Sequence, residues 1–161
     1  FPEVLETWRV VVAGKAGWLQ EREAIPPVLQ DAVRRKRLVF PGFVTDFQKY
    51  KLLRFADASL YPSFFEGFGL PVLESLSVGT PCVASFSSSI PEVGGEACVY
   101  FDPFSAESLY LALRHVERVG LKGSPAFVAA CATLRQRFTW ENMLTQILVR
   151  LVPELRRHAG V

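Results

Sequence analysis

Two carboxylates, Glu66 and Glu74, stand eight positions apart at the ends of a glycine-rich segment, Glu-Gly-Phe-Gly-Leu-Pro-Val-Leu-Glu. The short apolar run before this segment ends at Tyr61 and is typical of a strand. Pro71 suits the first position of a helix, because the N–H of that position has no intrahelical partner. The segment is therefore predicted to be a loop that joins a strand to a helix. Carboxylates accept hydrogen bonds from hydroxyl groups, so a ligand rich in hydroxyl groups fits this pair.

The start of the helix is predicted to bind an anion. Four amides are expected to lack partners within the helix, those of Gly69, Leu70, Val72 and Leu73, and the helix dipole adds partial positive charge there. The glycines at 67 and 69 let a ligand approach the backbone closely. A diphosphate with hydroxyl-rich ends would fit, and a nucleotide-sugar has this chemistry. For either carboxylate taken alone, the alternative is an acidic turn whose glutamate stabilises the helix.

The segment from Glu66 to Glu74 closely resembles the C-terminal domain of glycosyltransferase family 4, the group 1 retaining glycosyltransferases. Two further stretches carry the resemblance, Gly79-Thr80-Pro81-Cys82-Val83-Ala84-Ser85 and Pro91-Glu92-Val93. It extends from about Val10 to Trp140. The resemblance implies an α/β fold, a Rossmann-like parallel sheet with helices on both faces, which forms the C-terminal half of a two-domain (GT-B) enzyme. Residues 1–161 would be a single donor-binding domain, truncated at its N-terminus, with the acceptor domain absent from this chain.

The resemblance also implies roles for particular residues. Glu66 would be the catalytic residue that positions the donor sugar through its hydroxyl groups, and Glu74 would hold the ribose hydroxyl groups. The other implied donor-binding residues are Lys15 near phosphate, Phe43 and Val44 against the base, and Gly67, Phe68, Gly69, Leu70, Val72 and Leu73 around the diphosphate. No cofactor is implied, because the nucleoside-diphosphate sugar is a substrate. No metal is implied, since the chain contains no Asp-x-Asp.

The implied activity is that of a hexosyltransferase, which moves a hexose from a nucleoside-diphosphate sugar to an acceptor in polysaccharide or glycolipid biosynthesis. The pairing of Gly-Lys-Ala-Gly-Trp with Glu-Gly-Phe-Gly-Leu-Pro is similar to bacterial polysaccharide mannosyltransferases and favours GDP-mannose. The alternatives are a sugar-nucleotide epimerase and a non-catalytic binding or scaffold module. A nicotinamide-binding domain is disfavoured, since Gly-x-Gly-x-x-Gly is absent after the first predicted strand. The family's first strand, with its diphosphate-gripping Arg and Lys, is not found before Trp8. The chain alone is expected to be inactive, because in the family the cleft forms between the two domains.

The composition of the chain limits which classes of fold, partner and location are expected. The chain has 161 residues, half of them hydrophobic and 21% charged, which predicts a globular domain with its own core. A net charge of +2 does not favour nucleic acid as a partner. Three cysteines without metal spacing are typical of buried thiols in a reducing compartment. No apolar run is long enough to span a membrane. The expected location is cytoplasmic, with peripheral association of the full protein at the inner face of the membrane.

Strands and helices are predicted to alternate along the chain. The predicted strands are Trp8–Ala13, which is expected to be buried, Leu38–Phe40, Ser59–Tyr61, Cys82–Ser85 and Cys98–Phe101. The predicted helices are Leu19–Lys36 in two pieces, Asp46–Ala56 behind the capping box Thr45-x-x-Gln48, a helix from Pro71 that ends at Gly79, Ser105–Val119, Pro125–Arg137 behind the cap Ser124, and Trp140–Arg157 behind the cap Thr139. A long polar loop is expected over Ser87–Gly95.

This alternation predicts one parallel sheet, in which right-handed crossovers place every strand's C-terminal end at the same edge. Ligands bind at such an edge. The loops expected to converge there are Gly14–Trp18, Phe43–Thr45, Phe64–Leu70 and Phe86–Pro91. The basic run Arg34–Arg37 is interpreted as a charged helix end beside its own dipole rather than as a membrane or phosphate site.

Overall fold

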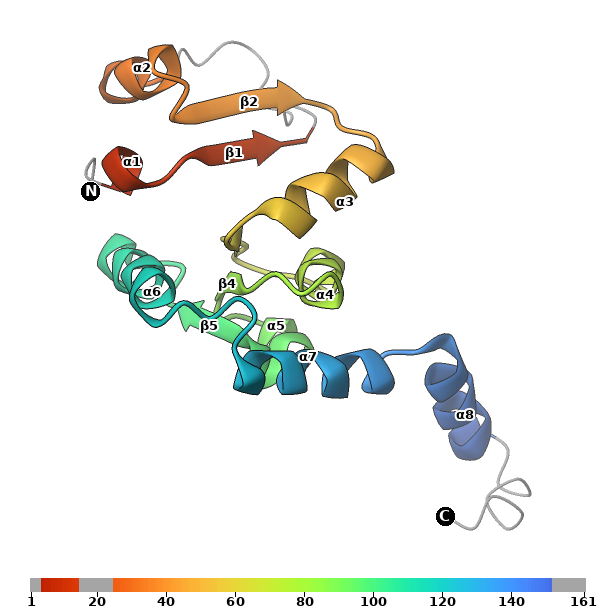
Figure 1. Cartoon of the computed structure of the whole chain (residues 1–161). Coiled ribbons are helices and arrows are strands. Elements are labelled where there is room, and N and C mark those ends of the chain that lie inside the picture. The colour runs from red at the N-terminus through yellow and green to blue at the C-terminus, as the bar shows by residue number, and fades with distance from the viewer. Residues whose placement is uncertain (1–3, 15–24, 152–161) are drawn as a thin grey trace. The chain divides into compact units, whose positions relative to one another are not determined.

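The computed structural model describes residues 4–14 and 25–151 (Figure 1). These residues divide after Phe55 into two compact units, unit 1 before this point and unit 2 after it. Several predictions lie outside the described residues. They are Lys15 with most of its loop, the first part of the helix from Leu19, and the end of the last helix up to Arg157. No helix within the described ranges is long and apolar enough to cross a membrane.

Unit 1 contains a two-stranded parallel sheet. Its elements are α1 (Val4–Thr7), β1 (Val10–Ala13), α2 (Pro27–Arg34), β2 (Leu38–Gly42) and α3 (Asp46–Phe55). The prediction of a buried first strand beginning at Trp8 was wrong in both respects. β1 begins at Val10, and Val11 and Val12 remain 40% and 48% exposed. The reason is local, because a two-stranded sheet offers few neighbours to cover both faces of a strand.

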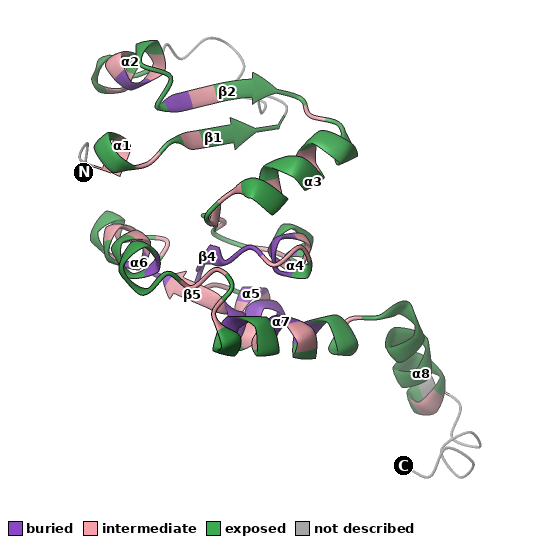
Figure 2. Cartoon of the chain, viewed as in Figure 1, coloured by how far each residue is buried: buried purple, intermediate pink, exposed green. Residues whose placement is uncertain are grey.

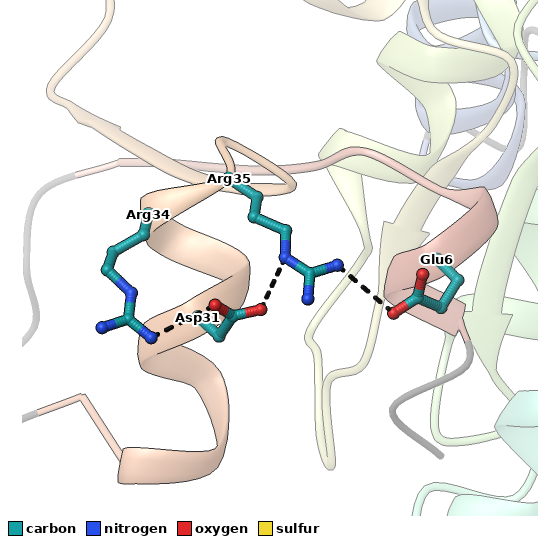
Figure 3. Close-up of polar contacts among 4 residues, drawn as sticks. All are labelled: Glu6, Asp31, Arg34 and Arg35. Carbon is teal, nitrogen blue, oxygen red and sulfur yellow. Dashed lines mark hydrogen bonds and ion pairs between the residues drawn. The ribbon is translucent and has the colours of Figure 1, made fainter.

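The basic run at the end of α2 takes part in local ion pairs (Figure 3). Arg34 and Arg35 both reach Asp31, at 3.1 and 2.6 Å, and Arg35 also lies 3.7 Å from Glu6. All four side chains are largely exposed, so these pairs contribute little to stability. This arrangement supports the interpretation of the run as a charged helix end.

Unit 2 contains a three-stranded parallel sheet in the order β3-β4-β5. Its elements are β3 (Ser59–Tyr61), α4 (Leu70–Ser77), β4 (Cys82–Ser85), α5 (Ile90–Gly94), the 3₁₀ turn η1 (Gly95–Ala97), β5 (Cys98–Phe101), α6 (Ala106–Val119), α7 (Pro125–Arg137) and α8 (Trp140–Leu151). Ser59 is paired with Cys82, which is paired with Cys98, so the three strands begin at one level. All three therefore deliver their following loops to the same edge.

Both faces of β4, the central strand of this sheet, are covered (Figure 2). Cys82 and Ala84 point into a core formed with α4, α5, η1 and α7, whereas Val83 lies on the opposite face because side chains alternate along a strand. Val83 is also fully buried, and α6, which packs on β5, contributes the buried Ala112 and Val116. Strands buried on both faces are typical of parallel sheets covered by helices.

Local capping rules set several helix boundaries. At α3 the capping box forms as predicted, with the Thr45 N–H donating to Gln48 Oε1 at 2.9 Å and the Gln48 N–H donating to Thr45 Oγ1 at 3.3 Å. The predicted caps of α7 and α8, Ser124 and Thr139, also accept from the backbone three residues ahead. Ser105, predicted as the first residue of its helix, is instead the cap of α6 and accepts from the Ser108 N–H. One prediction was wrong, since the loop expected over Ser87–Gly95 contains α5, which Pro91 helps to start and whose Ile90 and Val93 are buried.

Candidate functional site

Two loops meet at the C-terminal edge of the unit 2 sheet. The Glu66 loop, residues 62–69, follows β3, and the serine loop, residues 86–89, follows β4, the neighbouring strand. The Glu66 loop leads directly into α4, which lies beside β4 and α5 (Figure 1). Parallel pairing thus brings the Glu66 and serine loops side by side, as predicted for two of the four loops.

Three consecutive serines fasten the Glu66 loop through its backbone. Ser87 Oγ donates to the carbonyl of Phe64 at 2.5 Å, and the Glu66 N–H donates to Ser88 Oγ at 2.9 Å. Ser89 Oγ lies within donating distance of the carbonyls of Glu66 and Phe68, at 2.9 and 3.0 Å. Because these bonds join positions more than twenty residues apart, the conformation of the Glu66 loop depends on the serine loop.

Ser88 adopts an unusual backbone conformation, with φ of 45°. A residue other than glycine rarely occupies this left-handed region, and residues held there cluster at functional sites. Here the conformation accompanies the bond from the Glu66 N–H to Ser88 Oγ. The backbone strain at Ser88 is therefore associated with holding the Glu66 loop.

The Glu66 carboxylate is held by two hydroxyl groups. Tyr61 Oη donates to Oε1 at 2.6 Å, and Ser63 Oγ donates to the same oxygen at 2.7 Å. These bonds, first from Tyr61 and then from Ser63, lower the pKa of Glu66, while burial opposes them. Burial, followed by the bond and the charge of Glu66, raises the pKa of Tyr61. Glu66 is therefore ionised and Tyr61 protonated at neutral pH.

This pKa shift links stability to pH. The folded pKa of Glu66 lies below its unfolded value, so its contribution to stability is present above the unfolded value and is lost as the pH falls through the folded one. This direction of the pH dependence is the one expected for a carboxylate whose charged form accepts hydrogen bonds in the native state. A site that depends on this negative charge should therefore weaken under acidic conditions.

The start of α4 differs from its prediction by one residue. The helix begins at Leu70, with Gly69 as its cap at φ of 100°, so Pro71 occupies the second position. The Gly69 carbonyl accepts from the N–H of Val72 at 3.0 Å and from that of Leu73 at 3.3 Å. The prediction that these two amides are free of intrahelical partners was therefore wrong, because the earlier start supplies them with an acceptor. The amides of Gly69 and Leu70 remain as the candidate anion donors.

Replacing Gly69 should disturb this helix start. A Cβ at Gly69 would lie 3.8 Å from Ile90 Cγ1 and 3.9 Å from Val72 Cγ2, which is ordinary contact, so the cost comes from the positive φ. We expect Gly69→Ala to lower the free energy of unfolding by about 1–3 kcal/mol, measured by urea denaturation. Gly69→Asn should lower the free energy of unfolding by less, because asparagine tolerates a left-handed backbone conformation better than alanine does. Equal stability of Gly69→Ala and the wild type would contradict this explanation.

The remaining predicted residues of unit 2 occupy different environments. The Val72 side chain is fully buried in the core, so any ligand contact would be limited to its backbone. Phe68 is partly exposed and packs edge to face on Phe138, with ring centres 5.6 Å apart. Leu70 is exposed at the helix start, and Glu74 lies half-buried in the second turn of α4. Joint contact of Glu66 and Glu74 with one ligand stays a prediction.

Phe43 and Val44 follow β2 in unit 1, as predicted for a strand-to-helix turn. Phe43 is 68% exposed. Their contact with a nucleotide base stays a prediction, as does that of Lys15, which lies outside the described residues. Within the described residues, no group of three or more His, Cys, Asp or Glu side chains could hold a metal ion.

A surface hollow of about 450 Å³ lies at the same edge, at the C-terminal ends of β4 and β5. It is lined by Phe86, Tyr100, Phe101, Asp102 and Ser108. The rings of Phe64 and Phe104 lie 5.2 Å apart, so the Glu66 loop contacts the turn after β5. The edge therefore presents aromatic side chains beside the Glu66 loop.

Sequence reasoning missed the residues that hold Glu66. Tyr61 and Ser63 were treated only as the strand end and the loop, and the serine run was left open between a cleft lining and plain surface. The available signal was the run Ser-Ser-Ser itself at the end of a predicted strand. Its partners could not be identified, because all three serines bond to a loop more than twenty residues earlier.

Comparison with known proteins gives matches to glycosyltransferases at the level of both the family and individual relatives. The family model described as "Glycosyl transferases group 1" matches residues 1–118. The "O-antigen chain mannosyltransferase B" of Escherichia coli is 33% identical over 141 residues, which cover 86% of this chain and 36% of that protein. The "GDP-mannose-dependent alpha-(1-6)-phosphatidylinositol dimannoside mannosyltransferase" of Mycobacterium tuberculosis is 32% identical over 148 residues, or 89% and 35% of the two chains.

A similar solved structure is HepE from Anabaena in complex with UDP. It superposes with a TM-score of 0.75 at 20% identity, over 89% of this chain and 40% of that one. At this identity the likeness establishes the fold, an α/β arrangement of parallel strands and helices that matches part of a GT-B glycosyltransferase. The chain spans 36% and 35% of the two relatives' lengths.

Proposed function

The chain belongs to the group 1 glycosyltransferase family, and on this basis we propose that the Glu66 loop and the start of α4 bind a nucleoside-diphosphate hexose. The complete enzyme transfers the hexose to an acceptor with retention at the anomeric carbon. The observation that carries this proposal is the Glu66 carboxylate, held by two hydroxyl groups at the C-terminal edge of a parallel sheet.

In the proposed complex, the N–H groups of Gly69 and Leu70 face the diphosphate, where the dipole of α4 adds partial positive charge. The developing negative charge of the leaving nucleoside diphosphate is stabilised there. Glu66 accepts hydrogen bonds from the donor sugar, and Glu74 accepts from the ribose. Neither residue transfers a proton in this scheme.

GDP-mannose is the proposed donor. The two relatives above are named as mannosyltransferases, and the name of one specifies GDP-mannose dependence. The UDP in the HepE structure makes a uridine nucleotide the comparison to include. The acceptor domain belongs to the part of the enzyme outside this chain, so we expect nucleotide-sugar binding but no turnover from residues 1–161 alone. The three free cysteines support a reducing, cytoplasmic location.

A ligand panel tests this function. We expect GDP-mannose and GDP to raise the thermal unfolding midpoint of the chain, whereas NAD leaves it unchanged. A ligand at a hundred times its Kd adds about 2.7 kcal/mol of stability, which is readily measured. Release of GDP from GDP-mannose by the complete enzyme then tests transfer. Binding of GDP-mannose without release of GDP would favour a scaffold module. If no nucleoside diphosphate changes the unfolding midpoint, the proposal is contradicted.

A further inference from the structure

The two oxygens of the Glu66 carboxylate have different surroundings. Oε1 accepts from both Tyr61 Oη and Ser63 Oγ, at 2.6 and 2.7 Å. Oε2 accepts no hydrogen bond from the described residues. A carboxylate has about four acceptor positions, two on each oxygen. Because both hydrogen bonds go to Oε1, Oε2 keeps its capacity to accept hydrogen bonds from a ligand.

Tyr61 is well placed to fix an orientation. It ends β3, where its backbone is paired with Ala84 of β4, and its ring packs against the buried core of unit 2. The backbone and the ring of Tyr61 are therefore held by β4 and the core rather than by the Glu66 loop. The serine loop holds the backbone of Glu66 independently, through Ser88 and Ser89. Backbone and carboxylate are thus fastened at separate points.

We propose that Tyr61 and Ser63 are positioning residues that hold Glu66 Oε1, so that Oε2 accepts a hydroxyl group of the donor sugar. This inference rests on the proposed function and specifies which atom meets the sugar and what kind of group it takes. An ionised oxygen can only accept, so it selects a hydroxyl group and repels a phosphate. A donor whose contacted hydroxyl is replaced by fluorine, which cannot donate, should bind more weakly.

A purely structural role for Tyr61 predicts different results. Loss of a structural hydrogen bond would lower stability and weaken all ligands alike. Loss of a positioning bond should raise the pKa of Glu66 and weaken GDP-mannose selectively, since GDP lacks the sugar. Tyr100→Phe provides the matched control, because Tyr100 packs on the same core but donates to the Gly95 carbonyl, at 2.9 Å.

The experiment combines two measurements on the 161-residue chain. The side-chain carboxyl of Glu66 is titrated by ¹³C NMR in the wild type, Tyr61→Phe, Ser63→Ala and Tyr100→Phe, and each is titrated with GDP and GDP-mannose by calorimetry. We expect Tyr61→Phe and Ser63→Ala to raise the pKa of Glu66, with the larger rise for Tyr61→Phe. Tyr61→Phe should weaken GDP-mannose by roughly three- to tenfold and leave GDP unchanged, and Tyr100→Phe should change neither quantity.

Two results would overturn the inference. One is an unchanged Glu66 pKa in both Tyr61→Phe and Ser63→Ala. The other is an equal loss of GDP and GDP-mannose affinity in Tyr61→Phe. If the wild type binds neither nucleotide, the proposed function fails and the assignment of Oε2 to a sugar fails with it. The NMR titration still decides in that case whether the two hydroxyl groups hold Glu66, so the two failures are distinguishable.

Discussion

Glu66→Gln should lower the affinity for GDP-mannose by about ten- to a hundredfold while preserving the fold. The change is nearly isosteric, but it replaces an ionised acceptor with a neutral amide. Hydrogen bonds to charged groups contribute about 1.5–3 kcal/mol, which corresponds to a loss of this size. Calorimetric titration of the chain measures the binding, and GDP release by the complete enzyme measures the turnover, which should fall at least as far.

Glu96→Gln is the matched control for this substitution. Glu96 is an exposed glutamate in η1, outside the Glu66 loop and α4. We expect its variant to bind GDP-mannose as the wild type does. If Glu66→Gln and Glu96→Gln both retain full affinity, the donor does not contact Glu66, and the proposed role of this carboxylate is wrong.

Gly94→Ala should cause a large loss of stability. Gly94 is buried at the end of α5, where a Cβ would collide with Cys98 Sγ and lie 2.7 Å from Tyr100 Oη. Overpacking a core costs about 1–3 kcal/mol, and displacing the Tyr100 hydroxyl from the Gly95 carbonyl adds about 1 kcal/mol. We therefore expect a decrease of about 2–4 kcal/mol in the free energy of unfolding, measured by urea denaturation with circular dichroism.

Gly67→Ala separates this packing effect from the general effect of adding a methyl group. A Cβ at Gly67 meets no atom within 4 Å, and its φ is not positive. We expect its stability to remain within about 0.5 kcal/mol of the wild type. Its affinity for GDP-mannose should nevertheless fall if the ligand approaches this backbone. A Gly94→Ala variant as stable as Gly67→Ala would show that the core near Cys98 and Tyr100 accommodates the added methyl group.

The sequence was most informative where structure depends on near neighbours. The capping box of Thr45 and Gln48, the caps Ser124 and Thr139, and the stop of α4 before Gly79 all involve groups three or four residues apart. Such signals require no knowledge of the rest of the fold. The parallel pairing of the strands could also be predicted, because strands alternating with helices favour a parallel sheet.

Features that depend on distant partners could not be predicted in the same way. The exposure of Val11 depends on which elements cover β1, and the helix α5 depends on burial of Ile90 and Val93. The two amides wrongly predicted to be free depended on a one-residue difference in where α4 begins. Sequence signals place a helix start less reliably than they establish the helix itself.

In the candidate site, too, some features could be predicted from neighbouring residues and others depended on distant partners. The sequence indicated Glu66, its glycines and the helix that follows, because their spacing carries a chemical meaning. It did not indicate Tyr61 as the residue that orients Glu66, because a tyrosine at the end of a strand is equally typical of a core position. Only the folded loop, held by Ser88 and Ser89, brings the hydroxyl group and the carboxylate together.

An NMR titration of the ¹⁵N-labelled chain with GDP-mannose tests most directly whether the Glu66 loop and the start of α4 hold the donor. We expect the largest shift changes at the amides of Gly67, Gly69 and Leu70, with smaller changes toward Glu74 along α4. GDP should reproduce the changes at Gly69 and Leu70 but not those that depend on the sugar near Glu66. Saturation with GDP-mannose that leaves these amide signals unmoved, while others in the chain shift, would contradict this assignment.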